Sequence, residues 1–453
     1  MPNELRAHSR FRLRSQDLLV CLTMGITSSA CGADSGVSGG EGGAGNGSGA
    51  GGAHAAAGSG NSGGNAAGSS SGGAPMAAAG TSNGASAGTS NGGAGAGGHA
   101  GSGGVSGGGG KSSSGGASGG SGGSSCSAPA AGSTLLGWAA VSGGGVTTTT
   151  GGGAVAPTTV TTVAELNSAA AGTNAAVIWV KGSLKGEIKV GSNKTIAGLC
   201  GAELHGHVEV SGSTNVIIRN IAIVGYGVGD CSLDPSFDSS VGCSSGADAI
   251  SVQKKSNHIW IDHCDISDGT DGNLDITNAA DFVTVSWTKF HYSPRKDPEG
   301  SDSTGDAGHR FSNLVGGSDS ATGDAGTLNI TWHHDWWADN VVERQPRVRF
   351  GKNHLFNNLW SSSASNYCVR AGTQAQILVD DSVFTGIKDP QQFNSTTDQG
   401  TSFITATNNV YTNISGTKAT GGGGTAFTSP PYAYTPDPTG TLQAAIQSGA
   451  GPH

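Results

Sequence analysis

Short segments that alternate apolar with polar residues recur along the second part of the chain. They are rich in β-branched and aromatic residues, and each has the length of one half-buried strand. The segments begin at Asn215, His258, Phe282, Leu328, Asn353, Ala375 and Phe403. Helical periodicity is scarce, and 163–172 is the clearest helix candidate, with Thr162 as its N-cap.

The spacing of these segments predicts how they pack. Ile259 and Val283 are 24 residues apart, as are Ile330 and His354, and Ile377 follows His354 by 23. A period in the low twenties indicates stacked coils, each pairing with the next. We therefore predict an all-β chain that forms a right-handed, single-stranded parallel β-helix. A β-sandwich is the alternative, but its turns would recur every 8–12 residues.

Two intervals between strand segments are wider than one coil. They contain turn-rich polar insertions near 225–246 and 292–326. We expect these insertions to leave the coils as loops and to wall a groove.

Composition divides the 453 residues into unequal parts. Segment 32–125 is almost wholly Gly, Ser, Ala and Asn, so it has too little apolar surface to offset the entropy of ordering. We interpret 32–125 as a disordered linker and 126–453 as the β-helix domain. Segment 1–31 has four arginines and then a short apolar run, which predicts a secretory signal peptide.

The end of the signal leaves two routes open. "SSAC" at 28–31 resembles a bacterial lipobox, with Cys31 as the residue that would be lipidated, although Ser28 replaces the usual Leu. A lipid anchor at the cell surface and plain secretion are both consistent with it. Export permits disulfides, and Cys231 with Cys243 is the most plausible pair because both flank one polar loop. The other pairings stay open.

Charge limits the class of partner. The chain has a formal net charge of −9, and residues 1–125 carry five Lys or Arg and four Asp or Glu, so the part after them is acidic. Nucleic acid is therefore excluded as a partner. A polyanion would bind only where the local field is reversed.

Three aspartates fall at one coil's spacing. Asp248 and Asp271 are 23 residues apart, and Asp275 can join them if the chain bends at Gly272. Three close carboxylates repel one another, and Ca²⁺ with its 6–8 oxygen ligands would relieve that repulsion. The alternative is that these aspartates only form turns.

Three arginines crowd into "VVERQPRVRFG" at 341–351, in a chain with only 12% charged residues. Val348 alternates with Arg347 and Arg349, so both arginines would project from one outer face, and Arg344 would approach from the preceding turn. A bound anion would stabilise the trio. The alternative is a surface ion-pair patch around Glu343.

Several long motifs, in order, carry a resemblance to a known family. They are "NKTIAG" at 193, "NVIIRNI" at 215, "HIWIDHCDISDGTDGNLDIT" at 258, "FVTVSW" at 282, "HRFSNLVG" at 309, "TWHHDWW" at 331 and "ERQPRVRFGKNHLFNN" at 343. Together they resemble the pectate lyase superfamily, polysaccharide lyase family 1, over about 150–453. The resemblance implies a parallel β-helix that cleaves polygalacturonate by β-elimination to 4,5-unsaturated oligogalacturonides. Pectin is the implied partner, and a monomer is expected.

The resemblance also implies roles for single residues. Asp248, Asp271 and Asp275 match the calcium-binding aspartates, so Ca²⁺ is the implied cofactor. Arg344 matches the base that removes the C5 proton, and Arg349 matches a substrate-binding arginine.

The motifs depart from the family at one position. A lysine is usual before the "LIG" motif, whereas this chain has no aligned lysine there. Arg310 stands near the position and is a candidate substrate-binding residue beside Arg347 and Arg349, and Lys296 in the insertion is the other candidate. His333, His334, Asp262 and His263 are expected to be structural.

Three other functions share parts of this pattern. A pectin lyase acting on methyl-esterified pectin would need no calcium, so the complete aspartate trio disfavours it. A glycoside hydrolase would need a carboxylate pair, but the arginines would then lack a purpose. A non-catalytic pectin-binding β-helix would not need Arg344.

Overall fold

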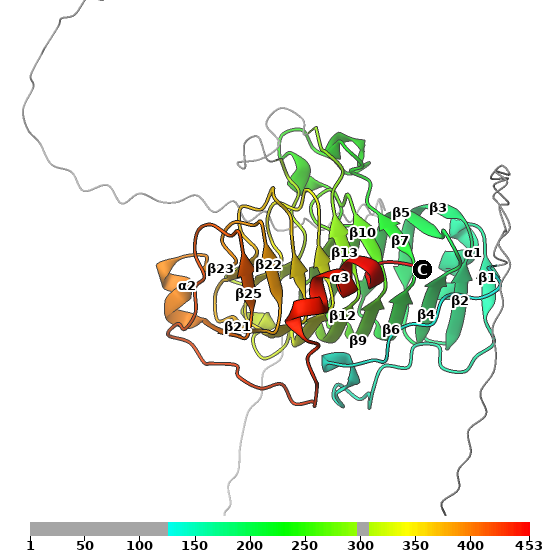
Figure 1. Ribbon diagram of the computed structural model, residues 1–453. Coiled ribbons are helices and arrows are strands. Elements are labelled where there is room, and N and C mark those ends of the chain that lie inside the picture. The colour runs from blue at the N-terminus through cyan, green and yellow to red at the C-terminus, as the bar shows by residue number, and fades with distance from the viewer. Residues whose placement is uncertain (1–125, 297–307) are drawn as a thin grey trace, which may run out of the picture. The chain divides into compact units, whose positions relative to one another are not determined.

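A computed structural model describes residues 126–296 and 308–453 (Figure 1). These residues form successive coils of short strands, and the strands pair in parallel with those of the next coil. The predicted all-β parallel β-helix is confirmed. The assignments of a signal peptide to 1–31 and a linker to 32–125 fall outside the described residues and stay predictions.

The coils have three faces. The first face is a 10-stranded sheet, and the second and third belong to one 15-stranded sheet, joined at the long strand β5. In sheet order, the first face consists of β1 (Thr158–Val160), β2 (Ala176–Val180), β4 (Lys194–Gly198), β6 (Thr214–Arg219), β9 (Asn257–Asp262), β12 (Asp281–Ser286), β15 (Ile330–His333), β18 (Lys352–Phe356), β21 (Gln376–Asp380) and β24 (Phe403–Thr407).

The other two faces run out from β5 (Glu203–Ser211), which also pairs with β3 (Ser183–Val190). The second face consists of β7 (Ala222–Val224), β10 (Asp265–Ser267), β13 (Lys289–His291), β16 (Trp336–Trp337), β19 (Leu359–Trp360), β22 (Val383–Thr385) and β25 (Val410–Thr412). The third face consists of β8 (Ile250–Gln253), β11 (Leu274–Ile276), β14 (Leu314–Val315), β17 (Arg347–Val348), β20 (Val369–Ala371) and β23 (Gln391–Phe393).

The expected helix is present as α1 (Val163–Ala170). The Thr162 hydroxyl accepts from the backbone of Glu165, whose carboxylate accepts from the Thr162 backbone, which forms a capping box. Sequence analysis missed α2 (Thr396–Thr401) and α3 (Thr439–Gly449). The short 3-10 helices are η1 (Trp138–Ala140), η2 (Cys231–Leu233), η3 (Cys243–Ser245) and η5 (Thr322–Asp324).

The register confirms the coil spacing but corrects one position. Ile259, Val283, Ile330 and Ile377 lie in one ladder, and the residue between the last two is Asn353, not His354. A one-residue shift moves a side chain to the opposite side of the sheet. Asn353 therefore points inward, where it accepts from the Trp332 indole at 3.0 Å. A strand pattern read from apolar residues alone does not identify an inward-facing amide such as Asn353.

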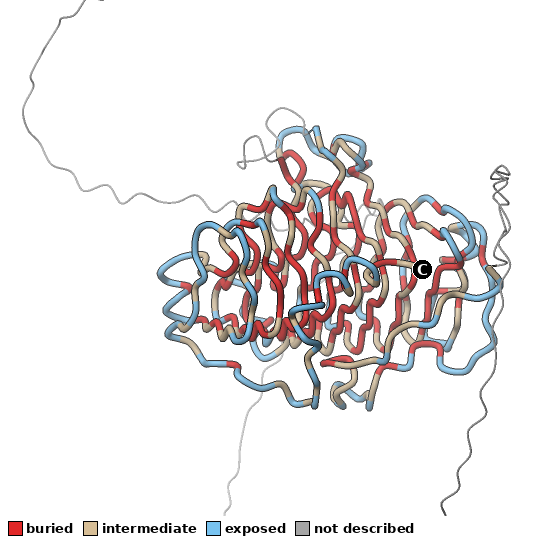
Figure 2. The backbone as a smooth tube through the Cα atoms, viewed as in Figure 1, coloured by how far each residue is buried: buried red, intermediate tan, exposed pale blue. Residues whose placement is uncertain are grey.

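Apolar side chains fill the inside of the coils, where Figure 2 shows the strands mostly as buried. The rings of Trp337, Trp360 and Phe384 stack from coil to coil, with centroids 4.8 Å and 4.1 Å apart. The Trp360 indole donates to the Gln345 carbonyl at 2.8 Å. The core thus supports the segment that follows Arg344.

The described residues form two disulfides, one within the loop between β7 and β8 and one that ties the start of the domain to a coil. Cys231–Cys243 confirms the expected pair, and Cys126–Cys200 joins the first described residue to the turn after β4. Cys264 and Cys368 are free and buried in the part of the chain that the structure describes. Among these residues there is no helix with the length and apolar character needed to cross a membrane.

Histidines line the outer side of the first face. His333 is buried, and its Nδ1 lies 3.0 Å from Nδ1 of His334, whose Nε2 lies 3.3 Å from Asp437 in the C-terminal segment. Asp262 accepts from the Ser133 hydroxyl at 2.7 Å. Segments from both ends of the domain thus bind this face, and these histidines and Asp262 hold them in place.

We predict that acid weakens this face. Burial first, and then the neighbouring His334, holds the pKa of His333 well below its ordinary value. The unfolded chain therefore takes up a proton near pH 6.5 that the folded chain refuses, so stability falls as pH drops below that value. His333→Asn removes this contribution. Urea unfolding at pH 7 and pH 5.5 should show a loss about 1 kcal/mol smaller in the variant, and parallel pH curves would contradict the prediction.

Candidate active site

The candidate residues meet where the second face turns into the third. Asp248 ends the loop between β7 and β8, Asp271 lies in the turn between β10 and β11, and Asp275 lies in β11. Arg344 precedes β17 on a later coil. Because parallel coils stack in register, residues far apart in sequence become neighbours at this corner.

The three aspartates converge as predicted. Asp248, Asp271 and Asp275 each offer a carboxylate oxygen, and these atoms lie within 4.8 Å of one another. Ser251 pairs with Asp275 in the ladder and donates to the Asp248 carboxylate at 2.8 Å. The spacing of one coil therefore did bring the carboxylates together.

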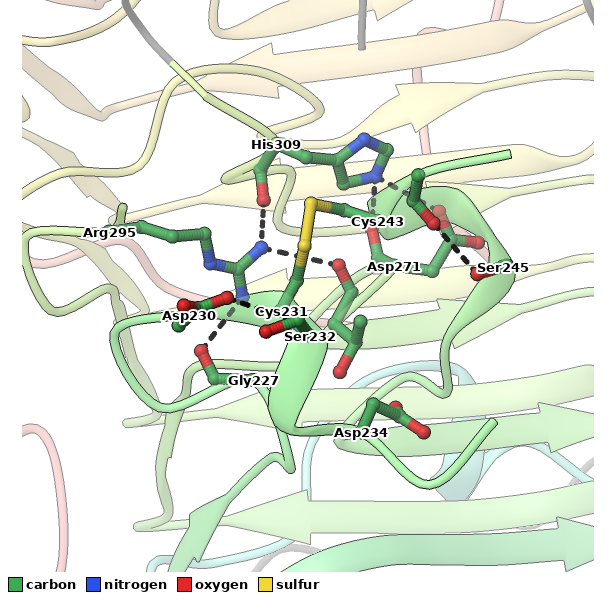
Figure 3. Close-up of a disulfide and its surroundings, with 12 residues drawn as sticks. Gly227, Asp230, Cys231, Ser232, Asp234, Cys243, Ser245, Asp271, Arg295 and His309 are labelled. Carbon is green, nitrogen blue, oxygen red and sulfur yellow. Dashed lines mark hydrogen bonds and ion pairs between the residues drawn. A yellow bond between two sulfur atoms is a disulfide. The ribbon is translucent and has the colours of Figure 1, made fainter. Parts of the chain in front are cut away.

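Each carboxylate is oriented by a donor from the protein. Besides the Ser251 hydroxyl at Asp248, the backbone N–H of Leu314 donates to Asp275 Oδ1 at 2.9 Å. His309 Nε2 lies 3.0 Å from Asp271 Oδ1 and 2.9 Å from the Asp271 carbonyl (Figure 3). These contacts fix the carboxylates while leaving further oxygen atoms for another ligand.

Burial and then repulsion raise the pKa of two of these groups. Burial, and then the charges of Asp275 and Asp271, raises the pKa of Asp248 well above its usual value. Burial and the Asp271 charge raise the pKa of Asp275 to about 7. Burial also opposes ionisation of Asp271, but its hydrogen bond with His309 and the nearby Arg344 outweigh burial and lower its pKa.

This donor set suits a hard cation. Asp248 Oδ1 is buried without a hydrogen-bond partner among the described residues. Oxygen-only ligands, clustered charge and an unsatisfied carboxylate oxygen are what Ca²⁺ prefers. Asp248, Asp271 and Asp275 are therefore the residues that could hold a metal ion.

Gly272 is required for a reason other than the predicted bend. A Cβ atom at this position would lie 2.9 Å from Asp275 Oδ1 and 3.0 Å from Asp248 Oδ1. Any side chain would therefore intrude between the carboxylates. The position needs the absence of a side chain more than unusual backbone freedom.

Arg344 faces the aspartates. Its Nη1 lies 4.0 Å from Asp271 Oδ1, and its Cζ lies 4.6 Å from the centre of the Phe311 ring. Burial by itself would lower the pKa of Arg344, but Asp271 and Asp275 outweigh burial and raise it. Its φ of 56° places the backbone in the left-handed region, which is costly for a residue with a side chain.

The other two arginines have different surroundings. Arg347 lies on the outer side of β17 and pairs in register with Leu314 and Arg370, while Val348 points into the core. Arg349 is 6% exposed and donates through Nε to Asp319 at 2.7 Å, as well as to the Gly316 carbonyl at 3.0 Å. Asp319 therefore already neutralises Arg349, whereas Arg344 faces the aspartates.

The two substitutes considered for the family lysine lie in different places. Lys296 is exposed, and its backbone donates to Gly229 at 2.7 Å in the disulfide-bonded loop. The Arg310 carbonyl accepts from Val342 at 2.9 Å, so Arg310 lies against the segment that leads into Arg344. Because it lies nearer to Arg344, Arg310 is the better candidate to replace the family lysine.

Sequence reasoning missed several residues of this site. His309 contacts Asp271, Phe311 packs on Arg344, and Arg370 extends the outward row that contains Arg347. Arg370 lies one coil after Arg347, and that spacing was a usable signal. His309 and Phe311 follow an insertion, which removes any fixed spacing to their partners.

Comparisons with known proteins point to one family. Residues 87–452 match the sequence profile of a family described as pectate lyase. Pectate lyase B of Colletotrichum gloeosporioides is 35% identical over 300 residues, which are 64% of this chain and 78% of that protein. Pectate lyase A of Aspergillus niger is 34% identical over 301 residues, which are 64% and 79% of the two chains.

Solved structures support the same fold. A pectate lyase from Bacillus sp. N165 in complex with trigalacturonate matches with a TM-score of 0.53 and 22% identity, over 70% of this chain and 99% of that one. A variant pectate lyase from Xanthomonas campestris matches with a TM-score of 0.53 and 21% identity, over 70% and 98% of the two chains.

We predict that Asp248→Asn stabilises the metal-free protein and removes its response to metal. At pH 7 the folded state must either bury the charge of Asp248 or protonate its carboxylate, and both cost free energy. The substitution removes this cost, so it should raise the free energy of unfolding by about 2 kcal/mol in chelator. A saturating divalent cation should stabilise the original protein by about 3 kcal/mol at 100 times its Kd, but not the variant.

Calorimetric melting with chelator and with added Ca²⁺ measures both effects. Asp339→Asn, at an exposed position, is the matched control and should change neither. Equal metal-induced shifts in the protein and in Asp248→Asn would contradict the prediction.

Proposed function

The chain belongs to the pectate lyase family and is a polysaccharide lyase, and from this premise we propose that it is a calcium-dependent pectate lyase. It cleaves (1→4)-α-D-galacturonan, the polygalacturonate of pectin, by β-elimination and leaves 4,5-unsaturated oligogalacturonides. The carrying observation is that Arg344 and the aspartate trio lie on one corner of the coils, with Arg344 Nη1 4.0 Å from Asp271 Oδ1.

Charge along the third face supports an anionic substrate. The outward row runs from Asp275 through Leu314 to Arg347 and Arg370, one coil at a time. Coils are spaced by about 4.8 Å, so a sugar chain lying across them would meet the acidic site first and then two cations. In the proposal, Arg347 binds a uronate carboxylate, and a cation held by the aspartates binds another.

Arg349 and Arg310 have smaller roles in this proposal. Arg349 holds Asp319 and the Gly316 carbonyl, so it would reach a uronate only by exchanging Asp319, whose side chain is 41% exposed. Arg310 would add positive charge on the approach to Arg344.

In the proposed β-elimination, Arg344 accepts a proton from the substrate. The C5 proton of galacturonate lies next to a carboxylate and is weakly acidic, and its loss is followed by cleavage of the bond to O4. Bound Ca²⁺ would compensate the aspartates and withdraw charge from the substrate carboxylate. Burial lowers the pKa of Arg344, and Asp271 and Asp275 are the first two of the charges that raise it, ahead of Tyr367 and Glu343. Compensating the two aspartates therefore favours a neutral, basic Arg344.

Three further assignments belong to the same proposal. The enzyme is exported, either free or tethered through Cys31, and it acts as a monomer. The basic start and the "SSAC" at 28–31 support export.

The substrate assignment predicts a simple pattern of activity. Ultraviolet absorbance of the unsaturated product should rise with polygalacturonate, fall to background with chelator and return with Ca²⁺. Methyl-esterified pectin should react far more slowly, because a neutral ester binds the cation and arginines poorly. Chelator-resistant activity on methylated pectin would instead identify a pectin lyase, and binding without product would identify a pectin-binding protein.

The role of Arg344 predicts a loss confined to turnover. Arg344→Lys keeps the positive charge but misplaces the base, so kcat should fall by about 100-fold or more, with KM within about threefold. Arg219→Lys, on the first face, is the matched control and should keep full activity. Full activity of Arg344→Lys would exclude Arg344 as the base.

A further inference from the structure

Arg295, which follows β13, donates to several backbone carbonyls (Figure 3). Its Nη2 donates to Gly269 at 2.7 Å and to Gly227 at 3.4 Å. Its Nη1 donates to Thr270 at 3.3 Å and also to the carbonyl of His309. One guanidinium therefore joins three separate parts of the chain.

Those three parts surround the aspartates. Gly227 belongs to the loop between β7 and β8 that ends at Asp248, and Gly269 and Thr270 immediately precede Asp271. His309 belongs to the segment that leads into β14. Hence the guanidinium connects the backbone of three segments that border the acidic site.

We propose that Arg295 is a positioning residue that sets the calcium site through the backbone that precedes Asp271 and through the segment that carries His309. The proposal rests on the proposed function, because it assumes that the aspartates bind Ca²⁺. Thr270 is covalently next to Asp271, and His309, whose carbonyl Arg295 holds, contacts Asp271 Oδ1 at 3.0 Å through its ring. Moving Arg295 would therefore shift Asp271 by two routes.

The Arg295 guanidinium is closely packed on two sides. A Cβ at Gly227 would lie 2.8 Å from Arg295 Nη2, and the Arg295 Cζ lies 5.0 Å from the centre of the Tyr292 ring. The Tyr292 hydroxyl in turn donates to the Phe311 carbonyl at 2.6 Å. A planar fork with five N–H donors can reach several carbonyls at once, whereas a lysine presents a single ammonium.

The backbone near Arg295 has anchors of its own. Ser293 donates to the Asp268 carboxylate through its backbone at 2.9 Å and through its hydroxyl at 3.0 Å. The backbone of Lys296 donates to Gly229 at 2.7 Å. Arg295 can therefore be substituted without releasing the segment that carries it.

The test compares Arg295→Gln, Arg295→Lys and Lys296→Gln in the full chain. Isothermal titration with Ca²⁺ alone, without substrate, should show a Kd raised about 10- to 100-fold in Arg295→Gln. Arg295→Lys should recover only part of the affinity. Lys296→Gln, which removes an exposed neighbouring charge, should bind Ca²⁺ as the original protein does.

Kinetics separate positioning from general support. At saturating Ca²⁺ the kcat of Arg295→Gln on polygalacturonate should return to within about threefold of the original. Hydrogen exchange in the metal-free protein should quicken at 268–273 in the same variant. Unchanged Ca²⁺ affinity with a lower melting temperature would overturn the proposal, and so would a lost kcat with unchanged affinity.

Measurements on the original protein show which idea has failed. If it binds no Ca²⁺ and releases no unsaturated product, the proposed function is wrong and this inference falls with it. If it does both, and Arg295→Gln matches it in Ca²⁺ affinity, only the role of Arg295 is wrong.

Discussion

Parallel stacking of coils in register is the constraint on which the site depends. Every outward position is repeated about 4.8 Å away on the next coil, so like residues at one coil's spacing are forced into contact. Ser251 and Asp275 occupy one such row, and Leu314, Arg347 and Arg370 continue it. The fold thus concentrates charge that a sequence distributes over more than a hundred residues. Such concentration is unfavourable unless opposite charge or a ligand compensates it.

The corner between the second and third faces allows both regular and irregular chain to contribute. Strand β11 fixes Asp275, whereas Asp248, Asp271 and Arg344 lie in turns and loops beside the strands. The coil core supports the turn that carries Arg344 directly, since the Trp360 indole donates to the Gln345 carbonyl. A rigid ladder therefore provides the spacing, and the loops provide carboxylates at angles that a strand could not offer. This division explains why a regular architecture carries an irregular site.

Much of this arrangement could be read from sequence because it depends on spacing. The strands, the Thr162 cap and the convergence of Asp248, Asp271 and Asp275 all follow local or one-coil rules. Helix α3 was not predicted because only two of its residues, Leu442 and Ile446, are buried, which is too few to give a clear helical pattern. The ion pair of Arg349 with Asp319 and the contact of His309 with Asp271 were not predictable, since both cross loops of irregular length. Long-range contacts without a period leave no trace in a single sequence.

The two cysteines that are unpaired among the described residues have a consequence of another kind. Cys264 and Cys368 lie on different coils inside the domain, and burial raises the pKa of both thiols. Only the thiolate attacks a disulfide or an alkylating reagent, so both sulfurs are inert while the coils stay closed. A reagent in solution would then modify each one only during a transient opening of its own coil. The rate at which each thiol is modified would therefore report how often the coil that contains it opens.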